Sequence, residues 1–319
     1  MDTSTPLDLS LRKATVERRK RPGHRCLGRQ RDNHFALLIG VPTACFSAAQ
    51  LRSLAEIVER YARFSHLTTA QSVLLVGIAP QHYEPARQAV RQAGFQIRSV
   101  GRDLFHVKCC PGGDFSPFGL QRTFDLVALI EEYFRGLPTP QKIKIALSGC
   151  PNCCANSRLS DFGLHAVVNG WKLYIGGRMG YAPLIGQELA GPISSDAVPG
   201  YLAAVLRVYR ELAEPNERLF RTLERIGLDD FRQRVEGLRH EPYDDLVEEA
   251  ARSRKAFEEE FTLADQDKQT LSSVGSEEKV FQPGKKNLCG NGRDEEPRQL
   301  GKNDQPLLAQ QPLKAPGGQ

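Results

Sequence analysis

Five of the chain's eight cysteines lie between Cys109 and Cys154, in two short groups. The first group is Cys109-Cys110-Pro111-Gly112-Gly113, and the second is Ser148-Gly149-Cys150-Pro151-Asn152-Cys153-Cys154. An iron–sulfur cubane needs about four thiolates that converge on one centre, with glycine and proline shaping the loops around the bulky sulfides. The composition of both groups therefore predicts a metallocofactor held between them.

The spacing within these groups leaves two kinds of metal site open. Cys150 and Cys154 are separated by three residues, and Cys150 and Cys153 by two, which also suits a structural zinc ion. Zinc sites commonly combine two such pairs, and the adjacent residues Cys109 and Cys110 are awkward ligands for one tetrahedral ion. The spacing favours an iron–sulfur centre, and zinc remains the alternative.

The segment before the first cysteine group has the pattern of alternating strands and helices. Short apolar runs predict strands at 35–41, 72–78 and 95–100. Ser47 and Gln50 form a capping-box pattern ahead of apolar residues at helical spacing. Pro85 suits the first turn of a second helix, which is expected to end before Gly94. Residues 34–101 are therefore expected to form a βαβαβ unit of an α+β fold.

A second unit is expected around and after the cysteines. Residues 124–135 predict an amphipathic helix, and residues 142–147 predict a strand that runs directly into the second cysteine group. The dipeptide Asn169-Gly170 lies between apolar runs at 162–168 and 171–175, which is the pattern of a β-hairpin. Further helices are expected at 200–212, 216–226 and 243–261.

The run Ser148-Gly149-Cys150-Pro151-Asn152-x-Cys154 resembles the cluster loop of the sirohaem-dependent sulfite and nitrite reductases. That family carries a C-x5-C pair and, further along the chain, a C-x3-C pair, and Cys110-Pro111-Gly112 resembles the start of the first. His66-Leu67-Thr68-Thr69-x-Gln71 and Tyr174-Ile175-Gly176-Gly177 resemble two further family motifs. The resemblance covers about residues 34–230. It implies a short, single-copy member: a ferredoxin-like half domain, then an α+β domain for a 4Fe–4S cluster and sirohaem.

The resemblance implies a role for each matching position. The metal ligands would be Cys110, Ser116, Cys150 and Cys154. The last of these would also bridge the cluster to the sirohaem iron. The residues approaching the sirohaem would be Asn152, Arg158, Gly176, Gly177 and Arg178. Lys142 and Lys144 match the family's Lys-x-Lys motif, and with His106 they are the candidate catalytic residues. An oxyanion that gains electrons and protons needs such positive charge nearby.

Three positions depart from the family pattern. The C-x5-C spacing from Cys110 leads to Ser116, where the family has a second cysteine. Alternative fourth ligands are Cys109 and Cys153. Ala70 and Phe105 occupy positions at which the family has arginines associated with substrate or sirohaem carboxylates. Candidate replacements for this charge are Lys108, Arg158, Arg102 and His106.

The composition bounds the class of protein and its partners. The chain has 319 residues, of which 40% are hydrophobic and 25% charged, the makeup of a globular protein. No apolar run is long enough to span a membrane and no secretory signal is visible, so a cytoplasmic protein with reduced thiols is expected. Residues 12–31 are strongly basic without interleaved aromatic residues, which disfavours nucleic acid as a partner and suits an acidic electron donor.

These observations combine into a division of the chain and a leading hypothesis. The expected segments are a basic disordered arm (1–33), the half domain (34–103), the 4Fe–4S and sirohaem domain (104–232), a helical extension (233–264) and a disordered tail (265–319).

The leading hypothesis is an oxidoreductase that reduces a small oxyanion, sulfite or nitrite, with single electrons from a ferredoxin-like donor. No glycine-rich dinucleotide-binding motif is visible in the sequence, which favours such a donor. The alternatives are a non-reductase electron-transfer or tetrapyrrole-binding relative, including the corrin-synthesis type, and a zinc-stabilised binding protein. A homo-oligomer is compatible with the sequence.

Overall fold

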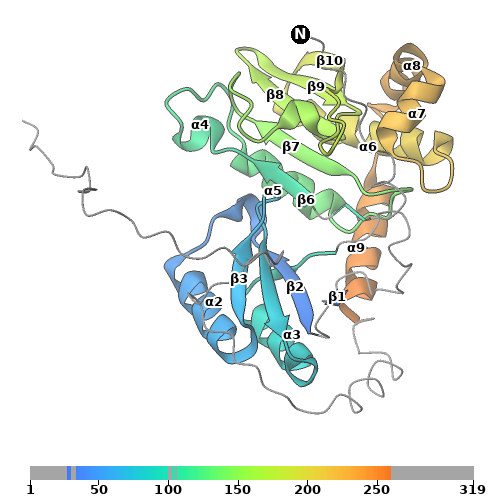
Figure 1. Cartoon of the computed structure of the whole chain (residues 1–319). Helices are drawn as coiled ribbons and strands as arrows, with labels where there is room; N and C mark the ends of the chain where they lie inside the picture. The colour runs from blue at the N-terminus through green and yellow to red at the C-terminus, as the bar shows by residue number, and fades with distance from the viewer. Residues whose placement is uncertain (1–26, 30–33, 100–102, 105, 260–319) are drawn as a thin grey trace, which may run out of the picture. The chain divides into compact units, whose positions relative to one another are not determined.

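Two five-stranded sheets, one in each half of the chain, organise the structure (Figure 1). The structure is a computed structural model that describes residues 27–29, 34–99, 103–104 and 106–259. The tail expected at 265–319 and most of the arm expected at 1–33 lie outside the described residues, as do Arg102 and Phe105.

The first sheet is antiparallel throughout, with the order β1-β2-β4-β3 and β5 also paired with β2. Its strands are β1 (Leu27–Arg29), β2 (Phe35–Gly40), β3 (Phe64–Leu67), β4 (Val73–Ile78) and β5 (Gln96–Ile97). Its helices are η1 (Pro42–Ala44), α2 (Ala48–Tyr61), η2 (Pro80–His82) and α3 (Tyr83–Gln92). Leu37 and Ile39 of β2 are fully buried in one core with Ile57 of α2 and Val90 of α3. Burial of these apolar side chains holds both helices to the sheet.

In the segment that forms the first sheet, the sequence patterns predict the two long helices correctly and the strands only in part. The capping box at α2 is confirmed, since Ser47 and Gln50 each accept a hydrogen bond from the other's backbone N–H. Pro85 lies in the first turn of α3, as expected. The expectation of no element before residue 34 is wrong for β1, β3 was missed, and the strand expected at 95–100 is reduced to β5. Short edge strands carry too few residues for a clear alternation of apolar and polar side chains.

The second sheet has the order β10-β9-β8-β7-β6, in which β6, β7 and β8 run parallel and the remaining pairs are antiparallel. Its strands are β6 (His106–Cys109), β7 (Lys144–Ser148), β8 (Phe162–Val167), β9 (Gly170–Ile175) and β10 (Gln187–Ile193). The β8–β9 hairpin confirms the prediction from Asn169-Gly170. The strands β6 and β10 were missed.

The second half also contains most of the helices. They are α4 (Gly112–Phe115), α5 (Phe124–Phe134), η3 (Ser157–Leu159), η4 (Ser195–Ala197), α6 (Val198–Leu212), α7 (Leu219–Ile226), α8 (Leu228–Leu238) and α9 (Asp244–Glu259). Helices α5, α6, α7 and α9 match the expected helices, whereas α4 and α8 were missed. None of the described helices combines the length and the apolar character that crossing a bilayer requires.

The second sheet has one apolar face and one polar face, because side chains alternate along each strand. The apolar face includes Val107, Ile145, Leu147, Leu164 and Leu173, which form the core with α5 and α6. The strand registers place the alternate residues on the other face. We call this the polar face; it comprises Lys108, Lys144, Ala146, Ser148, Gly163, His165, Lys172 and Tyr174. It lies next to the cysteine loops.

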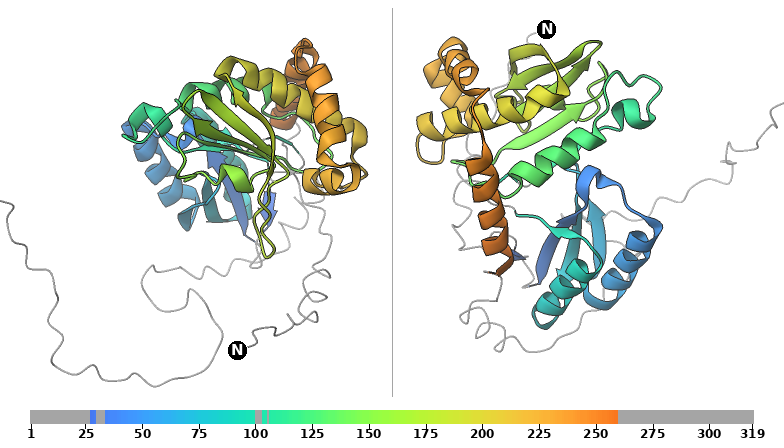
Figure 2. Two further views of the ribbon diagram at one scale, coloured as in Figure 1. Left: turned by 90° about the horizontal axis from the view of Figure 1, so that it is seen from above. Right: turned by 180° about the vertical axis from the view of Figure 1, so that it is seen from behind.

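Two contacts link the first sheet's segment to the cysteine domain. The side-chain amide of Gln71 donates to the carbonyl of Cys109 at 2.5 Å, and its oxygen accepts from the Cys109 N–H at 2.9 Å. The fully buried Arg98 donates to the Ser72 hydroxyl at 3.0 Å and lies 3.5 Å from the carboxylate of Glu131 in α5. Helix α9 also packs beside α5 (Figure 2). These contacts bring the turn that carries Gln71 to the end of β6.

Candidate functional site

The two cysteine groups lie side by side at the carboxyl ends of β6 and β7. Parallel neighbouring strands end at the same edge of a sheet, so Cys110 after β6 and Cys150 after β7 are brought together. The backbone N–H of Gly149 donates to the sulfur of Cys110 across 3.1 Å, and Cys110 N–H donates to the Leu147 carbonyl at 3.1 Å. Both cysteines are buried. Cys110 and Cys150 therefore lie at one corner of the sheet, which we call the cysteine corner.

Glycines allow the two loops to pack backbone against backbone. A Cβ on Gly149 would lie 2.3 Å from the Cα of Gly112, and a Cβ on Gly119 would lie 2.3 Å from the Gly112 carbonyl carbon. The Gly149 carbonyl accepts hydrogen bonds from Leu120 N–H at 2.7 Å and Gln121 N–H at 3.2 Å. No side chain larger than hydrogen fits at these glycines without moving the backbone, so they shape a cradle between the loops.

Asp114 anchors the first cysteine loop to α5. Its carboxylate accepts from the backbone N–H groups of Thr123 at 2.9 Å and Phe124 at 3.1 Å, and from Arg122 Nε at 2.9 Å. Burial alone would raise the pKa of Asp114, but these donors stabilise its anion and hold the pKa below its usual value. The loop is thus fixed to the amino terminus of a helix, where a negative charge is favourable.

The individual cysteines have different surroundings. Cys109 points into the hydrophobic core, and burial raises its pKa to about 12, so it stays a protonated thiol. Cys153 adopts a left-handed backbone (φ 56°), and its sulfur lies 3.4 Å from the Ser157 hydroxyl. Burial raises the pKa of Cys153, but hydrogen bonds from the Arg158 N–H and Ser157 outweigh this effect and lower it overall. Cys154 is exposed.

Ser116, the residue at the position of the family's second cysteine, ends α4 and is half-buried. Its hydroxyl accepts from the Phe118 N–H at 3.3 Å, which is an ordinary turn contact. Within the described part of the chain, no group of three His, Cys, Asp or Glu side chains is close enough to hold one metal ion. A cubane spaces its cysteines more widely than a single ion does, since each sulfur binds a different iron. Three cysteines on two glycine-lined loops fit such a cluster.

The predicted catalytic lysines lie at the opposite end of β7 from the cysteines. Lys144 begins β7 and Ser148 ends it, so their Cα atoms are about 13 Å apart along the strand. Lys144 aligns with His106 of β6, whose side chain is outside the described part of the structure. Partial burial and repulsion from Lys144 and Arg218 lower the pKa of Lys142. The structure therefore groups Lys142 and Lys144, but places both apart from the cysteine corner.

Asp161, which was not predicted from the sequence, fixes the strand end that carries Lys144. Its fully buried carboxylate accepts from Arg218 Nη2 at 2.7 and 2.8 Å and from the Lys144 N–H at 3.0 Å. Burial raises the pKa of Asp161, and the charge of Arg218 opposes this effect. Asp161 and Arg218 are 57 residues apart, so no local pattern in the sequence pairs them.

The glycine turn after β9 packs close to this same strand end. The Gly176 N–H donates to the Asp161 carbonyl at 2.9 Å, and a Cβ on Gly177 would lie 2.7 Å from the Ser160 carbonyl oxygen. Arg178 follows, with its guanidinium 4.2 Å from the centre of the Phe220 ring. Its buried Nε has no hydrogen-bond partner among the described residues. Such an unpartnered donor fits the contact with an anionic group that the resemblance implies.

The other predicted cofactor contacts are exposed. Asn152 lies at the surface of the second cysteine loop. Arg158 stacks over the Tyr174 ring on the polar face, 5.2 Å from its centre. His165 was not predicted from the sequence; its Nδ1 lies 3.4 Å from the Ser157 hydroxyl. Burial and the charges of Arg158 and Lys172 lower the pKa of His165. A Cys153–Ser157–His165 chain thus connects the second cysteine loop to the polar face.

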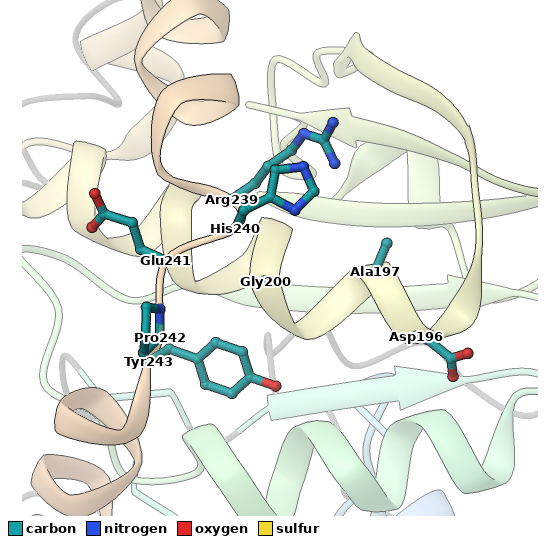
Figure 3. A pocket seen from close by; sticks show the side chains of 8 residues that line it. All are labelled: Asp196, Ala197, Gly200, Arg239, His240, Glu241, Pro242 and Tyr243. Atoms are coloured by element: carbon teal, nitrogen blue, oxygen red, sulfur yellow. The ribbon is translucent and has the colours of Figure 1, made fainter.

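A pocket of about 330 Å³ is lined by a different set of residues (Figure 3). Its lining residues are Asp196, Ala197, Gly200, Arg239, His240, Glu241, Pro242 and Tyr243. They belong to η4, the start of α6 and the connection between α8 and α9. None of the predicted cofactor or catalytic residues lines this pocket, so it is separate from the candidate site.

Two family models match the chain. Residues 28–93 match the nitrite/sulfite reductase ferredoxin-like half domain, and residues 100–241 match the nitrite and sulphite reductase 4Fe-4S domain. An assimilatory-type sulfite reductase of Nitratidesulfovibrio vulgaris is 32% identical over 211 residues, which are 65% of this chain and 95% of that protein. A nitrite reductase (NAD(P)H) of Bacillus subtilis is 30% identical over 253 residues, 74% of this chain. The chain spans only 31% of that relative's length.

Solved structures show the same fold. The Mycobacterium tuberculosis NirA protein superposes with a TM-score of 0.58 at 22% identity, covering 69% of this chain and 44% of that one. The family models and relatives give this chain a 4Fe–4S cluster and sirohaem as cofactors and oxidoreductase as its class, and they do not favour the zinc-protein or non-reductase alternatives. The resemblance found in the sequence is thereby confirmed: the chain belongs to the nitrite and sulfite reductase family.

Proposed function

We propose that this chain reduces a small oxyanion, sulfite or nitrite, with single electrons from a ferredoxin-like donor in a reducing, cytoplasmic compartment. The observation that carries the proposal is the cysteine corner, where Gly149 donates to the Cys110 sulfur and Cys150 follows directly. Relatives named as sulfite and nitrite reductases support the choice of substrates. When bound, the cluster and sirohaem supply single electrons and an iron position at which an oxyanion is reduced.

In this proposal, the cysteine corner holds the cluster. The ligands are Cys110, Cys150 and Cys154, with Ser116 at the fourth position. Cys109 is unsuited to that position, since it points into the core as a protonated thiol. Cys154 is exposed, so its sulfur is accessible to a second group outside the loop. An accessible sulfur suits the role that the resemblance implies for Cys154, which would hold the sirohaem as well as the cluster.

Positively charged side chains near the start of β7 bind the anionic substrate and the sirohaem carboxylates in this proposal. Lys144 and Arg178 supply positive charge to the substrate or to the sirohaem carboxylates, and Asn152, Arg158, Gly176 and Gly177 line the approach. Lys142 is exposed, but partial desolvation and the charges of Lys144 and Arg218 lower its pKa, which favours release of a proton. His106 joins these residues through its alignment with Lys144 in the sheet.

The test is turnover by the anaerobically purified holoprotein with reduced methyl viologen as donor and sulfite or nitrite as substrate. We expect turnover of one of these anions. Lys144→Met should lower kcat/KM by about tenfold or more, the value of one charge-assisted hydrogen bond. Lys255→Met is the matched control, because Lys255 is an exposed lysine of α9, a helix that contributes none of the candidate site residues. A holoprotein that carries both cofactors and reduces neither anion would instead favour the non-reductase relative.

A further inference from the structure

Lys108 lies between the two groups of residues that the proposed function needs. It is in β6 and aligns with Ala146, midway along β7 between Lys144 and Ser148. The register places Lys108 on the same face of the sheet as Lys144 and Ser148, between the positions of these two residues. Lys108 is therefore the polar-face cation that connects the lysine end of the sheet to the cysteine corner.

The surroundings of Lys108 differ from those of Lys172, another strand lysine on the polar face. Lys172 is paired with the Glu188 carboxylate at 2.9 Å, which neutralises it locally. Lys108 is half-buried, and no acidic side chain in the described part of the chain forms an ion pair with it. Burying an ammonium without a counter-charge costs free energy, and an anionic ligand recovers that cost. The ammonium of Lys108 is thus suited to bind a negatively charged ligand.

The residue next to Lys108 across the sheet carries no charge. It is Ala146 of β7, a small and fully buried side chain. A cation at Lys108 supplies positive charge on the same face as Lys144.

We propose that Lys108 binds an oxyanionic group of the holoenzyme, either a sirohaem carboxylate or the oxyanion substrate. The proposal rests on the function proposed above and extends it by one residue. Both ligands present carboxylate-like or sulfite-like oxygens to the ammonium, and the ammonium donates hydrogen bonds to them. The two sources are separated by experiment.

The experiment compares Lys108→Met, Lys108→Arg and the control Lys255→Met in the purified holoprotein. Sirohaem retention is measured by extracting the tetrapyrrole after desalting, and iron and acid-labile sulfide report the cluster separately. The dissociation constants of sulfite and nitrite are measured by titrating the visible spectrum. Unchanged thermal unfolding of Lys108→Met shows that any loss is not a loss of folding.

Two outcomes support the proposal. If Lys108 holds a sirohaem carboxylate, Lys108→Met loses sirohaem at an unchanged cluster content. If it holds the substrate, sirohaem content is unchanged and the anion's dissociation constant rises about tenfold or more. Lys108→Arg should recover most of either loss, because it keeps the charge.

The proposal is overturned if Lys108→Met retains sirohaem and binds both anions within about twofold of the wild type. In that case Lys108 is a solvated strand cation. Failure of the proposed function gives a different result, because the wild-type holoprotein would then bind or reduce neither anion. The sirohaem content of Lys108→Met would still show whether Lys108 binds a sirohaem carboxylate.

Discussion

The backbone N–H of Gly149 donates a hydrogen bond to the sulfur of Cys110 at 3.1 Å, although the two residues are 39 positions apart. This contact joins the loop after β6 to the loop after β7. It depends on glycine, because a Cβ on Gly149 would lie 2.3 Å from the Cα of Gly112. Two stretches of chain that are distant in sequence thus bring Cys110 and Cys150 to one corner of the sheet.

Gly149→Ala is therefore expected to open the cysteine corner. The added methyl group collides with backbone rather than with a flexible side chain, so we expect a loss of about 1–3 kcal/mol in unfolding free energy and a lower iron and sulfide content. Gly237→Ala is the matched control, because Gly237 lies in α8 with nothing within 4 Å of a new Cβ. That change should be neutral or slightly stabilising. Equal cluster content in both variants would contradict this account of the corner.

The cysteines should separate into cluster ligands and a core residue. Replacing Cys110, Cys150 or Cys154 by alanine should each abolish or strongly reduce bound iron and acid-labile sulfide. Cys109→Ala should keep the cluster and lower the unfolding free energy by about 1 kcal/mol, because Cys109 packs in the core. Iron and sulfide analysis of the four variants distinguishes these cases. A cluster retained in Cys110→Ala and lost in Cys109→Ala would reverse the assignment.

Asp161→Asn should destabilise the strand end that carries the lysines. The change leaves Arg218 without its buried carboxylate partner, and breaking such a pair costs about 3–5 kcal/mol. Chemical denaturation of the variant measures the loss. As a control, Asp229→Asn removes the exposed partner of Arg232 and should change stability by less than about 1 kcal/mol. Equal effects of the two changes would show that the Asp161–Arg218 pair has no special structural role.

Glu217 should make part of the stability dependent on pH. Hydrogen bonds from Arg225 lower the pKa of Glu217 from 4.5 to about 2. Because the folded-state pKa lies below the ordinary value, ionised Glu217 stabilises the fold above about pH 4.5, and this contribution is lost as the pH falls towards about 2. Glu217→Gln should cost about 1 kcal/mol at neutral pH, since solvent screens the partly exposed Arg225.

Urea denaturation of both proteins from neutral to acidic pH tests this prediction. The difference in unfolding free energy between wild type and Glu217→Gln should shrink as the pH falls below about 4.5. A difference that stays constant down to about pH 2 would mean that ionised Glu217 does not stabilise the fold in the way described.

Local signals made part of this structure predictable from sequence. Ser47 and Gln50 interact within one helical turn, and Asn169-Gly170 forms a tight turn, so neighbouring residues determine both features. The run around Cys150 identified the family for the same reason. In each case the residues that carry the signal are close together in the chain.

Long-range pairings were not predictable from such patterns. Asp161 meets Arg218, and Gln71 meets Cys109, only because the fold brings distant segments together. The different environments of Cys109 and Cys110 likewise depend on which face of the sheet is buried. Lys144 is separated from the cysteine corner by the length of β7. This separation could not be read from the spacing of the residues in the sequence.

The central claim, that the corner holds an iron–sulfur cluster coupled to sirohaem, is tested most directly by the visible spectrum of the anaerobically purified protein. We predict the Soret and red bands of sirohaem, together with about four iron atoms of the cluster and about four acid-labile sulfides per chain. A colourless protein that carries stoichiometric zinc and no sulfide would contradict the account.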